Sequence, residues 1–181
     1  MQKENLILGL KGHPDLQLRV ITKNDIEDLR NWKNSNKTSF FLNQDITPEQ
    51  QTKWFTVFSN QEHEHMFIVE QENGGEWKSI GCMGFRKLDD EGCTDAYNII
   101  RSQKIEPASF TMSDAFGTML AYAASLYDLP VRCKVLSVNP AVEWYKKNDF
   151  SIVSTENNYY LMELDKSTLR KFDWFMKNNQ Q

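Results

Sequence analysis

The sequence predicts a mixed α/β fold, with a single, mostly antiparallel sheet and helices on both faces. Hydrophobic residues make up 40% and aromatic residues 12% of the 181 residues, enough to build the core of one domain spanning residues 1–181. Strand patterns joined by short turns in the middle of the chain predict antiparallel pairs. A helical pattern between two later strand patterns predicts one parallel pair, so the sheet is mixed.

The first part of the chain predicts one strand followed by two helices. Apolar and polar side chains alternate over residues 16–21, which indicates a half-buried strand. Asn24 and Glu27 have the spacing of a capping box, so we expect a helix to begin there and to end in the polar stretch 34–37. Thr47, followed by proline and then Gln50, predicts the start of a second helix.

The middle of the chain predicts an antiparallel meander. Strand patterns cover residues 66–69, 77–88 and 94–101. The turns between them, at 73–75 and 89–92, are rich in Asn, Asp and Gly, which tolerate positive φ.

The last part of the chain returns to alternating helices and strands. A helix over 113–127 ends before Pro130, and a final amphipathic helix over about 165–177 carries Leu169, Phe172 and Phe175 or Met176. That last helix docks either on the body of the chain or on a second copy, as in a homodimer, and the sequence leaves both open. Between them we expect a strand over 131–138, a short helix over 140–147 and strands over 150–154 and 159–164.

Composition argues against several classes of function. With 21 basic and 25 acidic residues the net charge is −4, and no basic block occurs, so we expect no nucleic-acid partner. No apolar run approaches the roughly 20 residues of a membrane span, so we expect no membrane partner. The three cysteines, Cys82, Cys93 and Cys133, are odd in number and widely spaced, which favours free thiols in the cytoplasm. The three histidines have no partners at metal-ligand spacing, so we expect no metal site.

Two motifs carry the most information. Residues 112–118 (MSDAFGT) stand at the start of the long helix, with small residues at Ala115 and Gly117. Residues 139–150 (NPAVEWYKKNDF) follow the next strand. Together with the strand and helix order, they resemble the GNAT superfamily of acetyl-CoA-dependent N-acetyltransferases. Met112 stands where the family has Arg or Gln, and Asp149 where its signature has Gly.

The resemblance implies that acetyl-CoA is the cosubstrate and that its pantetheine arm lies between two diverging parallel strands. A helix N-terminus suits the diphosphate, because free backbone N–H groups and the positive end of the helix dipole attract anions. The predicted coenzyme-binding residues are Ile99, Ile100, Arg101, Met112, Ser113, Asp114, Ala115, Phe116, Gly117, Thr118, Asn139 and Tyr145.

The resemblance also implies the catalytic groups. Attack of an amine on a thioester expels a thiolate, and a phenol beside the sulfur protonates it, a role for which we choose Tyr145. Asp95 and Glu106 are candidates for the general base, and a chain of waters is the alternative. Backbone amides of residues 97–100 are candidates to stabilise the oxyanion. No cysteine stands in a recognisably activated setting, which favours direct attack over a covalent intermediate.

The N-terminal half contains residues 32–35 (WKNS), 40–42 (FFL) and 46–55 (ITPEQQTKWF). These segments resemble the branch holding ribosomal-protein N-terminal acetyltransferases and amino-sugar acetyltransferases. There the region forms the acceptor side of the cleft, which makes Trp32, Phe40, Phe41, Trp54 and Tyr97 the predicted acceptor-binding residues. Core packing is the alternative for Trp32 and Trp54. For the whole protein, the alternative to an enzyme acting on a primary amine is a non-catalytic member that binds an acyl-CoA or a protein.

Overall fold

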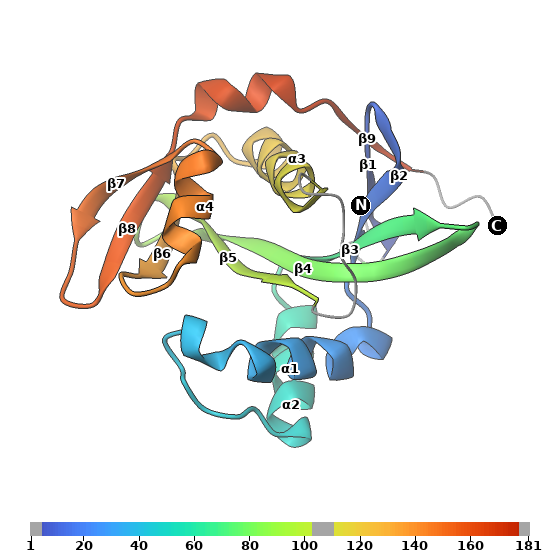
Figure 1. Cartoon of the computed structure of the whole chain (residues 1–181), viewed down its shortest axis with the longest axis horizontal. Coiled ribbons are helices and arrows are strands. Elements are labelled where there is room, and N and C mark those ends of the chain that lie inside the picture. Colours follow the sequence, from blue (N-terminus) through green and yellow to red (C-terminus); the bar gives the residue numbers. More distant parts are fainter. Residues whose placement is uncertain (1–4, 103–110, 178–181) are drawn as a thin grey trace.

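The computed structural model describes residues 5–102 and 111–177, and in these ranges nine strands form one sheet (Figure 1). The order across the sheet is β7-β8-β6-β5-β4-β3-β2-β1-β9, and only the β5–β6 pair is parallel. This confirms the predicted mixed, mostly antiparallel sheet. The strands are β1 (Ile7–Leu10), β2 (His13–Val20), β3 (Glu64–Asn73), β4 (Glu76–Leu88), β5 (Cys93–Arg101), β6 (Val131–Leu136), β7 (Phe150–Thr155), β8 (Tyr159–Leu164) and β9 (Trp174–Met176).

Helices cover both faces of the sheet, as predicted. Helices α1 (Ile26–Ser35) and α2 (Pro48–Ser59) lie on one face, and α3 (Thr111–Leu126) and α4 (Ala141–Lys147) lie on the other (Figure 1). Short 3-10 helices are η2 (Lys23–Asp25), η3 (Lys37–Ser39) and η4 (Lys166–Lys171). Strand β3 shows how one segment serves both layers: Phe67 belongs to the core cluster under α3, and its neighbour Ile68 to the cluster under α1 and α2. Both faces are buried, so the strand is apolar along most of its length.

The start of α1 corrects one prediction. The capping box joins Thr22 and Asp25, not Asn24 and Glu27, and η2 precedes α1. The Asp25 carboxylate accepts the Thr22 backbone N–H at 2.6 Å and two hydrogen bonds from the Arg19 guanidinium, each at 2.9 Å. The ion pair with Arg19, which precedes the cap and is not part of the capping-box pattern, favours Asp25 as the capping partner. The second helix starts as predicted, with reciprocal bonds between Thr47 and Gln50.

The C-terminal segment corrects another prediction. In place of an amphipathic helix over 165–177, the chain forms η4 and then β9, which pairs with β1. Leu169 is buried, and the Phe172 ring lies over Gly117 of α3. The segment therefore docks on the body of its own chain, where the open edge of β1 supplies hydrogen-bond partners that a helical pattern cannot reveal.

Strands β5 and β6 separate soon after they begin. Only Thr94 and Asp95 of β5 pair with β6, opposite Val131 and Arg132. Beyond that point β5 follows β4 and β6 follows β8, and within the described ranges no further β5–β6 pairing occurs. The register of β5 against β4 also shifts near Asn98, a non-glycine residue with φ 51°. This bulge bends β5 and leaves a V-shaped opening between the two strands.

The described residues were predicted to hold neither a membrane span nor a metal site. Among the helices described, none is both long and apolar enough to cross a membrane. In the same part of the chain, no group of three or more His, Cys, Asp or Glu side chains is placed to hold a metal ion.

Candidate active site

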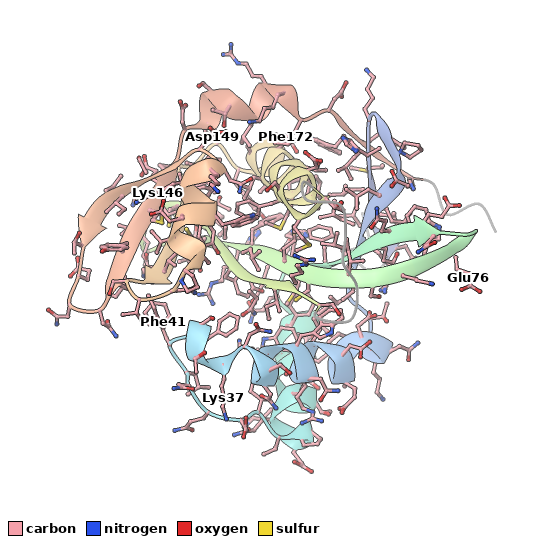
Figure 2. The ribbon with its side chains drawn as sticks, in the orientation of Figure 1. Lys37, Phe41, Glu76, Lys146, Asp149 and Phe172 are labelled. Carbon is pink, nitrogen blue, oxygen red and sulfur yellow. The ribbon has the colours of Figure 1, made fainter. Side chains whose placement is uncertain are left out.

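A cavity of about 720 Å³, called the principal cavity below, occupies the V between β5 and β6 and extends to the segment that follows η3. Phe41 lies where that segment approaches the half of the sheet that holds β6 and β8 (Figure 2), and its ring meets the Tyr159 ring edge-on at 5.5 Å. Many of the predicted site residues line this cavity, from both the coenzyme and the acceptor sets. They are Phe40, Phe41, Trp54, Asp95, Tyr97, Ile99, Ile100, Arg101, Asn139 and Tyr145.

Tyr145 lines the cavity from α4, and its ring is held by the core. The ring meets Phe116, Trp144 and Phe150 edge-on, at 6.0, 5.2 and 5.7 Å between centroids. Its hydroxyl makes no hydrogen bond with any residue in the described ranges. Burial raises the pKa of the phenol well above its ordinary value, and the neighbouring Cys133 and Asp95 side chains add to the shift. The group is thus a fixed, protonated donor beside the cavity.

Three carboxylates line the same cavity, each with a partner: Asp95, Glu64, and Glu91, which pairs with Lys134. Asp95 accepts from the Arg86 guanidinium at 3.0 and 2.9 Å, and burial raises its pKa although Arg86 opposes the shift. The Glu64 carboxylate accepts a hydrogen bond from the Tyr97 hydroxyl at 2.5 Å. Burial and this carboxylate together hold the pKa of Tyr97 well above its ordinary value. Asp95 was a predicted base, whereas Glu64 was not predicted as a site residue.

The Asn139 side chain makes two hydrogen bonds within the chain. Its side-chain oxygen accepts the Ala141 backbone N–H at 2.9 Å, and its side-chain nitrogen donates to the Ser39 carbonyl at 3.1 Å. Asn139 therefore joins the start of α4 to η3. The amide nitrogen has a second N–H, so the predicted bond to a coenzyme is compatible with the Ser39 contact.

The first motif, residues 112–118, lies inside α3, and this corrects the predicted coenzyme loop. Amides from Ala115 onward are at least four residues into the described helix, so they bond to carbonyls one turn back and are not free for an anion. The Ala115 and Phe116 side chains are fully buried in the core. Gly117 is covered by the Phe172 ring, whose nearest atom would lie 2.1 Å from a Cβ at that position. These three residues cannot contact a coenzyme as predicted.

Three other residues of this motif line a second cavity, of about 610 Å³, between α3, α4, η4 and the β1–β2 hairpin. Its walls carry three lysines and two aspartates, and Lys11 pairs with Asp173 at 2.8 Å. The motif residues are Ser113, Asp114 and Thr118, and the lysines are Lys11, Lys147 and Lys171. Met112 lies instead toward the sheet, with its Cε atom 3.1 Å from where a Cβ of Gly81 would be.

The predicted acceptor aromatics divide into two groups. Trp54, Phe40 and Phe41 line the principal cavity, and Trp54 stacks on Phe58 at 5.3 Å. Trp32 is buried in the core cluster under α1, so its predicted contact with an acceptor is wrong. Glu106, a predicted base, lies outside the described residues.

A third cavity, of about 280 Å³, lies between α1, α2 and the sheet and shares Lys33, Trp54 and Asn98 with the principal cavity. Lys33 was not predicted as a site residue. A signal existed, because Lys33 follows Leu29 by four residues and so stands on the apolar face of α1, where a lysine is unusual. Arg86 and Glu64 gave no such signal, since their meeting with Tyr97 and Asp95 depends on strand register.

Comparison with known proteins gives a family for the sequence and a fold for the structure. The family model for the acetyltransferase (GNAT) domain matches residues 15–151. No curated protein matches the sequence. Several solved structures share the fold at 14–16% sequence identity, a likeness that shows the fold alone.

Three of these structures show how much of the chain the likeness covers. The apo form of FdhC, described as a nucleotide-linked sugar GNAT, has a TM-score of 0.71 at 16% identity over 92% of this chain and 93% of that one. The spermidine N-acetyltransferase from Vibrio cholerae, in complex with CoA and spermine, has 0.65 at 16% over 90% and 95%. A domain from Methanocaldococcus jannaschii has 0.71 at 14% over 82% and 97%.

Proposed function

The chain belongs to the GNAT acetyltransferase family, and on that premise we propose that it transfers an acetyl group from acetyl-CoA to a primary amine by direct attack. The acceptor is a small molecule such as an amino sugar, or a protein N-terminus. Free, buried thiols support a reducing compartment, and we propose the cytoplasm.

One observation carries this proposal: the opening between β5 and β6 holds a cavity, and it is lined by Tyr145, whose hydroxyl makes no hydrogen bond with the described residues. If packed side chains closed the opening, no extended arm would reach the phenol. The residues on both walls suit the pantetheine arm of a coenzyme, with Ile99 and Ile100 on one side and Val135 on the other. Acetyl-CoA, when bound, supplies the activated acetyl thioester.

The side chains of this protein divide the proton transfers between them. Tyr145 donates its proton to the departing sulfur; the phenol is protonated at neutral pH, and burial, which raises its pKa, makes it a weaker acid but keeps the proton in place until the thiolate leaves. Asp95 or Glu64, directly or through water, receives the proton of the incoming ammonium. The β5 backbone amides beyond Asp95 that point away from β4 have no ladder partner on β6 in the described ranges, so they can donate to the developing oxyanion.

The thiols support direct attack. Burial raises the pKa of Cys82 to about 12, and it raises the pKa of Cys133 as well. Cys93 is also shifted upward, by burial and neighbouring carboxylates. A covalent route needs a thiolate, and these three groups remain thiols at neutral pH.

The distal part of the coenzyme has a second set of candidates. The cavity between α3 and α4 offers Ser113 and Thr118 hydroxyls and the ammonium groups of Lys147 and Lys171, which suit phosphate oxygens. Asp114 also lines this cavity and opposes an anion there. We therefore place the phosphates nearer the lysines of α4 and η4 than the Asp114 carboxylate.

The activity is tested by release of free thiol from acetyl-CoA in the presence of a panel of primary amines. We expect amine-dependent release, and we expect calorimetry to show binding of acetyl-CoA without any amine. Binding of acetyl-CoA with no transfer to any amine would favour the non-catalytic alternative. Absence of both binding and transfer would overturn the proposal.

A further inference from the structure

Lys33 occupies the point where the principal cavity meets the smaller cavity under α1 and α2. Its ammonium donates to the side-chain oxygen of Asn98 at 3.0 Å and lies 5.1 Å from the centre of the Phe40 ring. An ammonium has three donors, so two are left for a ligand in the cavity. Asn98 is the residue with φ 51° at the bulge of β5, so Lys33 is tied to the strand that borders the proposed reaction site.

Lys33 has no carboxylate partner among the described residues. The other ionic groups at these two cavities are mostly paired: Arg86 with Asp95, Lys134 with Glu91, and Asp45 with Lys37. Glu64 accepts from Tyr97 and stands opposite Arg86 in the β3–β4 register. Within the described ranges, Lys33 and Arg101 line the cavity and form no ion pair.

A partly buried ammonium without an anionic partner is costly, and a ligand can supply the missing charge. Burial lowers the pKa of Lys33, and the nearby Arg86 guanidinium lowers it further, so this environment disfavours a second cation. Resting on the proposed function, we infer that Lys33 binds an oxyanion on the acceptor amine, a carboxylate or a phosphate, and so selects against polyamines. The surrounding aromatic side chains Phe40 and Trp54 then cover the uncharged part of that acceptor.

The test compares amines that differ mainly in charge. Ethanolamine is compared with phosphoethanolamine, propylamine with β-alanine, and glucosamine with its phosphate ester, and spermidine serves as the polycation. For the wild-type chain we expect kcat/KM to be about tenfold or more higher for the anionic member of at least one pair, chiefly through a lower KM. The phosphate and carboxylate pairs show which oxyanion is preferred.

Charge reversal at Lys33 sharpens the test. We expect Lys33→Glu to abolish the preference for the anionic member and to raise the rate with spermidine, while Lys33→Gln removes the preference without reversing it. Lys53→Glu is the matched control, because Lys53 is an exposed lysine of α2 that lines neither cavity, and it should keep the wild-type ranking. If Lys33→Glu does not fold, the Gln variant gives the comparison.

Three outcomes would overturn the inference. The first is wild-type activity confined to neutral amines or to spermidine, which leaves the proposed function standing. The second is an equal loss of kcat for every amine in Lys33→Gln, which would make Lys33 a proton acceptor rather than a specificity residue. The third is no transfer to any amine, which would overturn the proposed transfer together with this inference; acetyl-CoA binding would then favour the non-catalytic alternative, and absence of binding would exclude that as well.

Discussion

Tyr145 combines the two properties that a proton donor in the cavity requires. Its ring is fixed by three aromatic neighbours, and its hydroxyl is left without a hydrogen bond among the described residues. Its pKa is raised by burial, so the protonated form extends to higher pH than in a free tyrosine. Its role as the proton donor stays a prediction, and this setting is compatible with it.

We expect Tyr145→Phe to lower kcat about a hundredfold or more, because general acid catalysis contributes on that order. The dissociation constant of acetyl-CoA should change little, since the ring and its packing remain. Steady-state kinetics and calorimetry measure the two effects, with Tyr160→Phe as a control phenol that does not line the cavity. Because the folded-state pKa is raised, the wild-type kcat should show no loss from this group up to about pH 10. An unchanged kcat in Tyr145→Phe would remove it from the mechanism.

Single residues also show where local sequence reasoning ends. Lys33 stands on the apolar face of α1, which is a readable signal, but its partner Asn98 is 65 residues away and depends on a bulge in β5. Asp149 stands where the family signature has Gly, and the structure explains that position, because Asp149 has φ 67°. Aspartate tolerates this left-handed region better than most residues, which lets the motif survive the change.

At the scale of elements, α3 and the C-terminal segment depend on each other. Gly117 leaves the space that the Phe172 ring fills, so the glycine that resembled part of a coenzyme loop serves the packing of η4 on α3. A small residue in a helix permits the close approach of either a ligand or another segment. The sequence alone does not distinguish these two uses, because the C-terminal segment arrives from 55 residues further along the chain.

We expect the effect of Gly117→Ala to change sign with the residue at 172. In the wild-type chain the new methyl would overlap the Phe172 ring, and we expect a loss of about 1–3 kcal/mol in the free energy of unfolding. In a Phe172→Ala background the overlap is gone, and alanine's higher helix propensity should make the same change neutral or stabilising by up to about 1 kcal/mol. Urea denaturation of the four proteins measures the coupling. Equal effects in both backgrounds would show that Phe172 does not occupy that space.

Elements with local signals were predicted well, and elements with distant partners were not. The meander β3–β5, the capping box of α2 and the β7–β8 hairpin follow from alternation, turn residues and cap spacing. Strand β1 was missed and β9 was taken for a helix, because β9 depends on pairing with β1 at one edge of the sheet, and the two strands lie far apart in the sequence. Strand β9 has three residues, too few for an alternation of apolar and polar side chains to indicate a strand.

At the scale of the whole molecule, the arrangement divides the sheet into two parts that meet at a short parallel contact. One part, from β9 to β5, lies against α1 and α2, where the acceptor side is predicted, and the other, β6 to β8, lies against α4 (Figure 1), which holds Tyr145. The family order of strands and helices predicted this division, since a parallel pair follows from the helix between β5 and β6. The width of the opening was not predictable, because it depends on the bulge at Asn98 and on contacts such as Asn139 to Ser39.

The most direct measurement is a crystal structure of this chain with coenzyme A bound. We expect the pantetheine arm between β5 and β6 and its sulfur within hydrogen-bond reach of the Tyr145 hydroxyl, at roughly 3–4 Å. Coenzyme bound elsewhere, with the opening between the strands empty or closed by side chains, would contradict the account.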